Sequence, residues 1–304
     1  MALIARSNRT KIGSLLVMAY VTTASAAHAE EYAEQKSSWT ASFSSQVSRE
    51  DKSEADKIMN GSFRLQWVHD TLSIGATVGA SRTAVKLPNV VEVVDTSSFN
   101  GGLNLGLSFG KSAIELDFGY SRQGLSGNVT AGTELSKATG NTSLALSGSV
   151  VSTSLGAAFI HTFGGEALTL TPRLAVNYGR TKTSARLTAG TRLPPIGGSI
   201  SSDGVSIIPE LNLGYAFSEK FNLNGSVSFT AATNGAASRL GSRPMGSGFV
   251  QTGQQNEGAT QWGSLALSAK LSPFHNIAVT PFIGTTVGRS TNEYFVGTAL
   301  SSSF

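Results

Sequence analysis

The chain has 304 residues, of which 34 are glycine, none is cysteine and only 14% are charged. The lack of cysteine excludes a disulfide framework and a cysteine-ligated metal site. The formal net charge is +4, but Arg6, Arg9 and Lys11 belong to a predicted leader, so 23 − 3 = 20 basic residues face 19 acidic ones beyond it, a net charge of +1. This balance gives no indication of nucleic-acid binding.

The first 29 residues have the pattern of a secretory signal peptide. The three basic residues precede an apolar or small stretch at 12–24, and Ala27-His28-Ala29 supplies a small-x-small cleavage site. That stretch is too short to span a bilayer, and no later segment has the roughly 18 apolar residues of a membrane-spanning helix. We predict a signal peptide at 1–29, a short periplasmic segment at 30–37 and a membrane domain of β-strands at 38–304.

Apolar and polar residues alternate in twelve segments of about ten residues, from Trp39 to the final residue, Phe304. Short turns are expected at 69–70, 110–112, 164–165, 218–220 and 272–273. Longer connections are expected near 50–56, 83–96, 123–147, 182–203 and 233–258, with a brief one near Ser290. The pattern predicts an all-β fold, a 12-stranded antiparallel transmembrane β-barrel. Because twelve is even, both termini fall on the short-turn side, which is the periplasm in bacterial outer-membrane barrels.

Three prolines fall inside predicted strands, at Pro172, Pro209 and Pro281. A proline has no N–H to donate to the hydrogen-bond ladder of a sheet, so it is normally confined to edges or bulges. We therefore expect a β-bulge at each of the three positions.

The outward phase of the strands carries two further signals. Four arginines stand at the ends of predicted strands that run from a short turn toward a longer connection, and they fall on the same face as the apolar residues: Arg82, Arg122, Arg180 and Arg289. We predict that they lie on the outer wall at the extracellular rim, where a guanidinium suits lipopolysaccharide phosphates. In the alternative, each arginine only ends a strand and reaches into water.

Aromatic residues near both predicted interfaces fit the girdles of a membrane barrel: Trp67, Phe109, Phe217, Phe221, Phe304, Tyr120, Tyr178 and Tyr294.

The inward phase is small and polar, with few charges. The predicted lumen-lining charges are Arg64, Glu115, Asp117, Arg173, Glu210 and Lys270. Three positive and three negative groups in a confined lumen are expected to pair with one another and to narrow the passage. Arg173 and Glu210 lie on adjacent predicted strands and form the best candidate pair. The alternative is a charged ring that selects small solutes.

Enzymatic activity is not expected. His28 belongs to the leader, and His69, His161 and His275 lie at or beside predicted periplasmic turns. A hydrolase of the outer-membrane phospholipase kind needs an outward histidine near the outer leaflet, and an omptin-like protease needs one above the rim. The acidic run at 50–56 fits a solvated loop better than a calcium site. The sequence predicts no metal site and no cofactor.

The chain resembles the barrel domain of the autotransporter family. The resemblance rests on the twelve-strand count, on Leu170-Thr-Pro172-Arg-Leu and Val279-Thr-Pro281-Phe-Ile as strand openings, and on the terminal Phe304. In that family the barrel is a C-terminal translocator, preceded by an exported passenger and plugged by a helix. Here only about residues 30–38 precede the first predicted strand, and Ser302 stands where an apolar or aromatic residue commonly accompanies the final Phe.

The resemblance implies a translocator-like barrel whose C-terminal strand is read by the barrel-assembly machinery. Phe304 is the expected assembly signal, and Leu300, Val296 and Tyr294 fall on the same face of the last predicted strand.

Three functions remain open for a barrel in the outer membrane of a Gram-negative bacterium. The first is a narrow channel for small solutes, which conductance would support. The second is a surface protein whose loops at 123–147 and 233–258 bind host or matrix ligands, which loss of binding after loop deletion would support. The third is a translocator whose passenger is encoded elsewhere.

Overall fold

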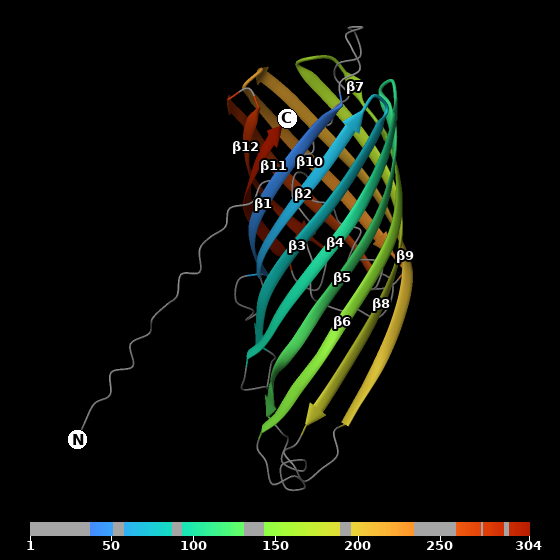
Figure 1. The fold of residues 1–304 in the computed structure, drawn as a ribbon, viewed down its shortest axis with the longest axis vertical. Helices are drawn as coiled ribbons and strands as arrows, with labels where there is room; N and C mark the ends of the chain where they lie inside the picture. The colour runs from blue at the N-terminus through green and yellow to red at the C-terminus, as the bar shows by residue number, and fades with distance from the viewer. Residues whose placement is uncertain are drawn as a thin grey trace, which may run out of the picture.

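The computed structural model describes residues 37–50, 58–86, 93–130, 143–188, 196–233, 260–274, 276–288 and 292–304. Within them lie β1 (Ser38–Glu50), β2 (Ile58–His69), β3 (Leu72–Lys86), β4 (Val93–Phe109), β5 (Ser112–Thr130), β6 (Ser143–His161), β7 (Phe163–Gly164), β8 (Leu168–Thr188), β9 (Ile196–Ser218), β10 (Phe221–Ala232), β11 (Thr260–Phe274), β12 (Ile277–Val287) and β13 (Glu293–Ser303). Apart from the short β7, each strand pairs antiparallel with the strands before and after it, and β1 pairs with β13 to close the ring (Figure 1).

The two-residue β7 continues the line of β6, because both pair with β8. The wall therefore consists of twelve long strands, and the predicted 12-stranded antiparallel barrel is confirmed. The start of β1 and the C-terminus meet at one end of the barrel, where Trp39 and Phe304 exchange backbone hydrogen bonds of 2.9 and 3.0 Å. No helix in the described part of the chain is long and apolar enough to cross a membrane.

The short turns lie at the same end of the barrel as the start of β1 and the C-terminus. Two-residue turns join β2 to β3, β4 to β5 and β9 to β10, and Asp70 and Gly110 take left-handed conformations in the first two. The turn predicted at 272–273 is wrong, since β11 continues to Phe274. The Ser272 amide donates to the Lys220 carbonyl over 2.8 Å, which keeps this residue in contact with the start of β10.

The strands are unequal in length, and the difference lies at the long-loop end. β8 and β9 have 21 and 23 residues, whereas β12 and β13 have 11 each. The wall is therefore tallest around β5, β6, β8 and β9 (Figure 1). Much of the predicted loop at 182–203 is strand, because backbone pairing such as Ser184 with Ser199 continues the ladder without apolar alternation. Parts of the loops predicted at 83–96 and 123–147 are strand for the same reason.

The bulges expected at the three prolines are also wrong, because each proline lies in register. Pro172 pairs with Leu211 on β9, while the β6–β8 ladder stops at Ile160 and resumes at Phe163 with the same offset. Pro209 likewise pairs with β8 and interrupts the β9–β10 ladder, and Pro281 pairs with β13 and interrupts the β11–β12 ladder. A missing N–H removes pairing on one side of the strand only, so a gap forms without a change of register.

The outer and inner faces differ in chemistry as the alternation predicts. On β5, Ile114, Leu116 and Phe118 point outward and are 44–49% exposed, while Glu115 and Asp117 between them point inward. Buried polar side chains from most strands line the inner face, among them Ser42, Ser152 and Thr181. An apolar wall around a polar interior is the inverse of a soluble barrel and matches a barrel surrounded by lipid.

Candidate functional site

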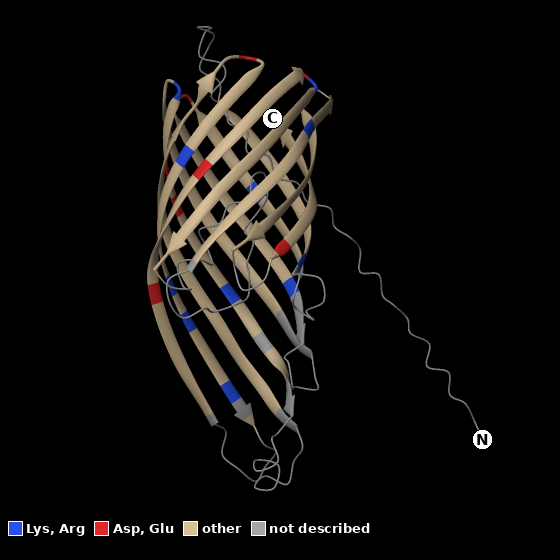
Figure 2. Ribbon diagram, turned by 180° about the vertical axis from the view of Figure 1, so that it is seen from behind, with Lys and Arg blue, Asp and Glu red and all other residues tan. Residues whose placement is uncertain are grey.

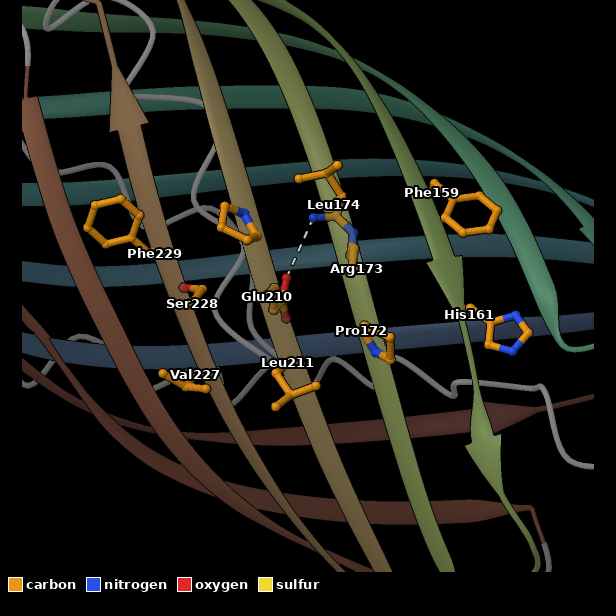
Figure 3. A pocket seen from close by; sticks show the side chains of 11 residues that line it. Phe159, His161, Pro172, Arg173, Leu174, Glu210, Leu211, Val227, Ser228 and Phe229 are labelled. Carbon is orange, nitrogen blue, oxygen red and sulfur yellow. Dashed lines mark ion pairs between the residues drawn. The ribbon is translucent and has the colours of Figure 1, made fainter.

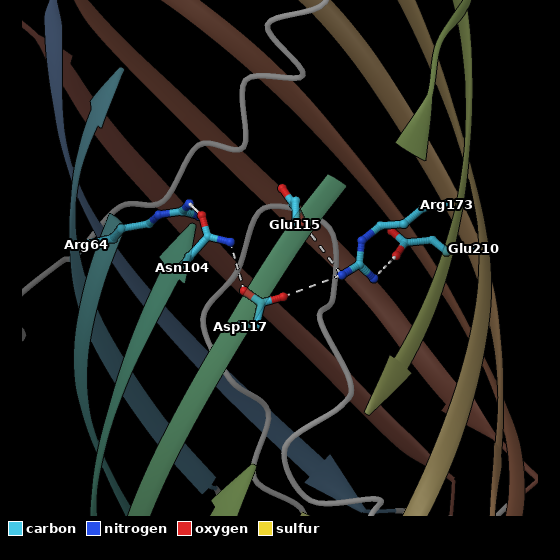
Figure 4. Close-up of polar contacts among 6 residues, drawn as sticks. All are labelled: Arg64, Asn104, Glu115, Asp117, Arg173 and Glu210. Atoms are coloured by element: carbon cyan, nitrogen blue, oxygen red, sulfur yellow. Dashed lines mark hydrogen bonds and ion pairs between the residues drawn. The ribbon is translucent and has the colours of Figure 1, made fainter. Parts of the chain in front are cut away.

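Six inward-facing side chains form a connected polar group across the barrel interior, here called the lumen network (Figure 4). Its members are Arg64 on β2, Asn104 on β4, Glu115 and Asp117 on β5, Arg173 on β8 and Glu210 on β9. With β3 and β6 between them, these strands form an unbroken arc of seven in the ring of twelve. The network therefore links more than half of the wall from the inside.

The first half of the lumen network joins β2 to β5. Arg64 Nη2 donates to Asn104 Oδ1 over 3.1 Å, and Asn104 Nδ2 donates to Asp117 Oδ1 over 2.9 Å. The strand between Arg64 and Asn104 carries Gly75, where an added Cβ would lie 3.2 Å from Arg64 Nε. The guanidinium crosses β3 because this position has no side chain.

The second half centres on Arg173, which faces three carboxylates. Its guanidinium nitrogens lie 3.5 Å from Glu210, 3.7 Å from Glu115 and 3.9 Å from Asp117. β6 separates β5 from β8, and its residues opposite Asp117 and Glu115 are Gly156 and Ala158. These small residues leave room for Arg173 to reach over β6.

The charges of the lumen network differ in exposure. Arg64 is 4% exposed, and the side chains of Arg173 and Glu210 are 9% and 7% exposed, whereas those of Glu115 and Asp117 are 20% and 31% exposed. Charges removed from water this far are stable only when they are paired and hydrogen-bonded. The pairs therefore hold the long side chains along the inner wall, and the carboxylates of β5 remain in contact with solvent.

The structure contains the expected Arg173–Glu210 pair and places all six predicted lumen charges on the inner phase. Sequence reasoning missed the pairing of Arg173 with β5, and the small residues on β6 are the signal for it. The expectation that every lumen charge has an ionic partner is wrong for Lys270. It is half-buried on β11, opposite Asn222, and forms no ion pair within the described residues.

Asn104 links Arg64 to Asp117 through its two amide atoms (Figure 4). We expect Asn104→Leu to lower the free energy of unfolding by about 1–3 kcal/mol, because two hydrogen bonds to charged groups are lost in a partly buried site. Urea titration of the barrel in detergent measures this. Ser226→Ala on β10, outside the lumen network, is the matched control and should change stability by less than about 0.5 kcal/mol. Equal effects of the two changes would contradict a structural role for Asn104.

The predicted rim arginines lie on the outer face near the long-loop end. Arg82, Arg122 and Arg180 are exposed there, and Arg289 lies outside the described residues. Figure 2 shows several basic residues on the strands toward this end. Tyr120 and Tyr178 stand two residues before Arg122 and Arg180 on the same face.

Two of the predicted histidine positions are described, and both adjoin the short-turn end. His69 stacks on Trp67 with ring centroids 5.6 Å apart, and His161 Nδ1 lies 2.7 Å from Ser112 Oγ. His275 and the acidic run at 51–56 lie outside the described residues. Where the structure describes the chain, no three His, Asp or Glu side chains are arranged to hold a metal ion.

A pocket of about 500 Å³ lies on the outer face over β6, β8, β9 and β10 (Figure 3). Its exposed apolar lining includes Phe159, Leu174, Leu211, Val227 and Phe229. Pro172 and Pro209 also line it, so the pocket covers the two ladder gaps that flank the β8–β9 pair. Its lining suits hydrocarbon and not a polar solute.

Comparison with known proteins identifies the architecture. No protein-family model and no curated sequence matches the chain. Among solved structures, the translocator domain of the autotransporter NalP from Neisseria meningitidis is 13% identical with a TM-score of 0.65, and the match covers 90% of each chain. The β domain of the Bordetella autotransporter BrkA is 11% identical with a TM-score of 0.60, covering 89% of this chain and all of that domain. The chain therefore has the fold of autotransporter-type outer-membrane barrels.

Proposed function

We propose that this protein is an outer-membrane channel that passes small polar solutes through a lumen narrowed by the lumen network. The single observation that carries the proposal is the position of that network, which lines the interior of a seven-strand arc behind an apolar outer wall. The half-buried Glu115 and Asp117 supply polar contacts along the remaining path. Passage by this route requires no catalytic step and no cofactor.

The width of the path depends on how firmly Arg173 is held. Three carboxylates from two strands surround its guanidinium, so the side chain cannot swing away without leaving charge unpaired. A narrow passage is expected for a barrel of this strand number, which lies between filled small barrels and open porins. The permeant solutes are therefore expected to be inorganic ions and small polar molecules.

Single-channel recording in planar bilayers tests the proposal. We expect the wild-type barrel to show small, steady conductance, and Arg173→Ala combined with Asn104→Ala to raise it on the order of twofold, because both halves of the lumen network lose the side chain that links them. Lys220→Gln, at a short turn, is the control and should leave conductance unchanged. Silence of both the wild type and the double variant in bilayers would contradict a channel.

The proposal places the short turns and both chain ends in the periplasm and the long loops outside the cell. It includes two partners. The exposed Phe304, with Leu300, Val296 and Tyr294 outward on β13, supports recognition by the barrel-assembly machinery. The exposed Arg82, Arg122 and Arg180 support contact with lipopolysaccharide phosphates.

A second candidate function is protein translocation, which the likeness to the NalP and BrkA barrels favours. The lumen network separates the two candidates. A translocator must let an extended chain pass the height of Arg173, whereas a small-solute channel keeps this crossing closed. Passage of an extended reporter chain through the wild-type barrel in lipid vesicles would support translocation, and ion conductance without such passage would support the channel.

A further inference from the structure

Four basic side chains gather on the outer face of two strands at the tall side of the barrel. Arg122 on β5 and Arg180, Lys182 and Arg186 on β8 are all exposed, and we call them the basic patch. None of the four forms an ion pair with another described residue. The sequence pattern predicts outward positions at strand ends for Arg122 and Arg180, whereas Lys182 and Arg186 fall within the predicted loop at 182–203.

The register of the strands brings the basic patch together. Arg122 pairs with Val151 on β6, and Val151 pairs in turn with Lys182, so the two cations flank one strand. With strands about 4.8 Å apart, their Cα atoms are separated by roughly 10 Å. Arg180 and Arg186 lie on the same face as Lys182, two residues before it and four after it.

The outer face of β6, which lies between the two basic strands, is accessible to a ligand. The outward residues of β6 at this height are Thr153, Val151, Ser149 and Ser147, and each is half-buried or exposed. Their side chains are shorter than those of Arg and Lys on either side. An anion can therefore approach β6 between cations that reach over it from both flanks.

The position of the basic patch along the wall indicates which anion is within reach. On β8 the outward residues run from Leu174 and Val176 to Tyr178 and then to Arg180. This order follows the hydrocarbon, interface and headgroup layers of a membrane. The column continues upward because β8 extends to Thr188.

One carboxylate lies next to the basic patch, and it is engaged by a tyrosine. Asp203 on β9 stands opposite Arg180, and Tyr178 Oη donates to its Oδ2 over 3.1 Å. The net charge of the group is therefore +3 when Asp203 is counted. The remaining excess of positive charge lies on Arg122 of β5 and on Lys182 and Arg186 of β8.

We infer that the basic patch is a binding site for the phosphate groups of outer-leaflet lipopolysaccharide. This lipid carries several phosphates at the height of the interface and just above it, which matches a column of cations on a single strand better than an isolated headgroup phosphate does. Arginine supplies paired N–H donors for each phosphate, and lysine adds a point charge between them. The inference rests on the proposed outer-membrane location and names the lipid partner on one arc of the wall.

Binding of purified lipopolysaccharide to the purified full-length barrel in neutral detergent tests the inference. The variant replaces all four cations of the basic patch by Gln. The matched control, Lys111→Gln with Lys220→Gln, removes cations at the short-turn end. We expect the patch variant to bind about tenfold more weakly, since losing even one charge-assisted contact removes that much affinity. The control should bind as the wild type does.

Two further comparisons use the wild-type barrel with different lipids. Wild-type barrel should bind dephosphorylated lipid A at least about tenfold more weakly than phosphorylated lipid A, a comparison that needs no variant to fold. It should also prefer lipopolysaccharide to phosphatidylglycerol in mixed micelles. Unchanged binding by the patch variant, equal loss in the control, equal binding of dephosphorylated lipid A or equal binding of phosphatidylglycerol would each overturn the inference. A wild-type barrel that fails to insert into membranes contradicts the proposed function instead.

Discussion

Replacing Leu116 by Arg is expected to lower the free energy of unfolding by about 2–4 kcal/mol when the barrel is embedded in lipid. Leu116 points outward from the middle of the apolar band on β5 and is 46% exposed. The large cost arises because a guanidinium at this depth must be stripped of water or must draw water into the bilayer. Reversible unfolding by guanidinium chloride in lipid vesicles measures the difference.

An arginine introduced near the membrane interface is the control for the effect of depth in the bilayer. Thr153 lies on the outer face of β6, in register with Tyr120, so Thr153→Arg places the charge at headgroup level. We expect a cost of about 0–1 kcal/mol there. Equal costs at the two positions would contradict a lipid-facing wall, and small costs at both would indicate a wall that faces water.

Replacing Arg173 by Ala is expected to destabilise the barrel by about 3–5 kcal/mol, as for other broken buried ion pairs. The change leaves Glu210, Glu115 and Asp117 facing one another without the cation that now lies 3.5–3.9 Å from each. Glu210 contributes most to the expected loss, because its side chain is only 7% exposed and cannot recover full hydration.

A double-mutant cycle separates this pairing from a general effect of shortening Arg173. Arg173→Ala combined with Glu210→Ala should recover a part of the loss, giving a coupling of about 1–3 kcal/mol between the two positions. Lys270→Ala, which removes a half-buried lumen cation without a described ionic partner, should cost clearly less than Arg173→Ala. Additive effects at Arg173 and Glu210 would show that their proximity has no energetic consequence.

The faces of the barrel were predictable from the sequence because side chains alternate with a period of two on any strand. That rule placed Arg64, Arg173 and Glu210 inward and Arg122 and Arg180 outward before any pairing was known. Strand length was less predictable. The upper parts of β8 and β9 contain Gly, Ser and Thr on both faces, so their pairing depends on backbone hydrogen bonds that no side-chain pattern reports.

The lumen network was only partly predictable for a different reason. Contacts between adjacent strands follow from order along the chain, and so the Arg173–Glu210 pair was expected. Contacts across an intervening strand depend on barrel curvature and on the size of the residue in between. Gly75 and Gly156 determine them here, and a glycine in a strand has several other readings, such as a bulge or a bend.

The in-register prolines make the mechanical strength of the wall uneven. Pro172 and Pro209 each withdraw hydrogen bonding from one outer edge of the β8–β9 ribbon, so this ribbon is joined less firmly to β6 and β10 than to itself. Thermal separation of neighbouring strands would therefore begin along these two seams. The apolar pocket lies directly over them, so that lipid chains and not water would cover the unpaired backbone during such an opening.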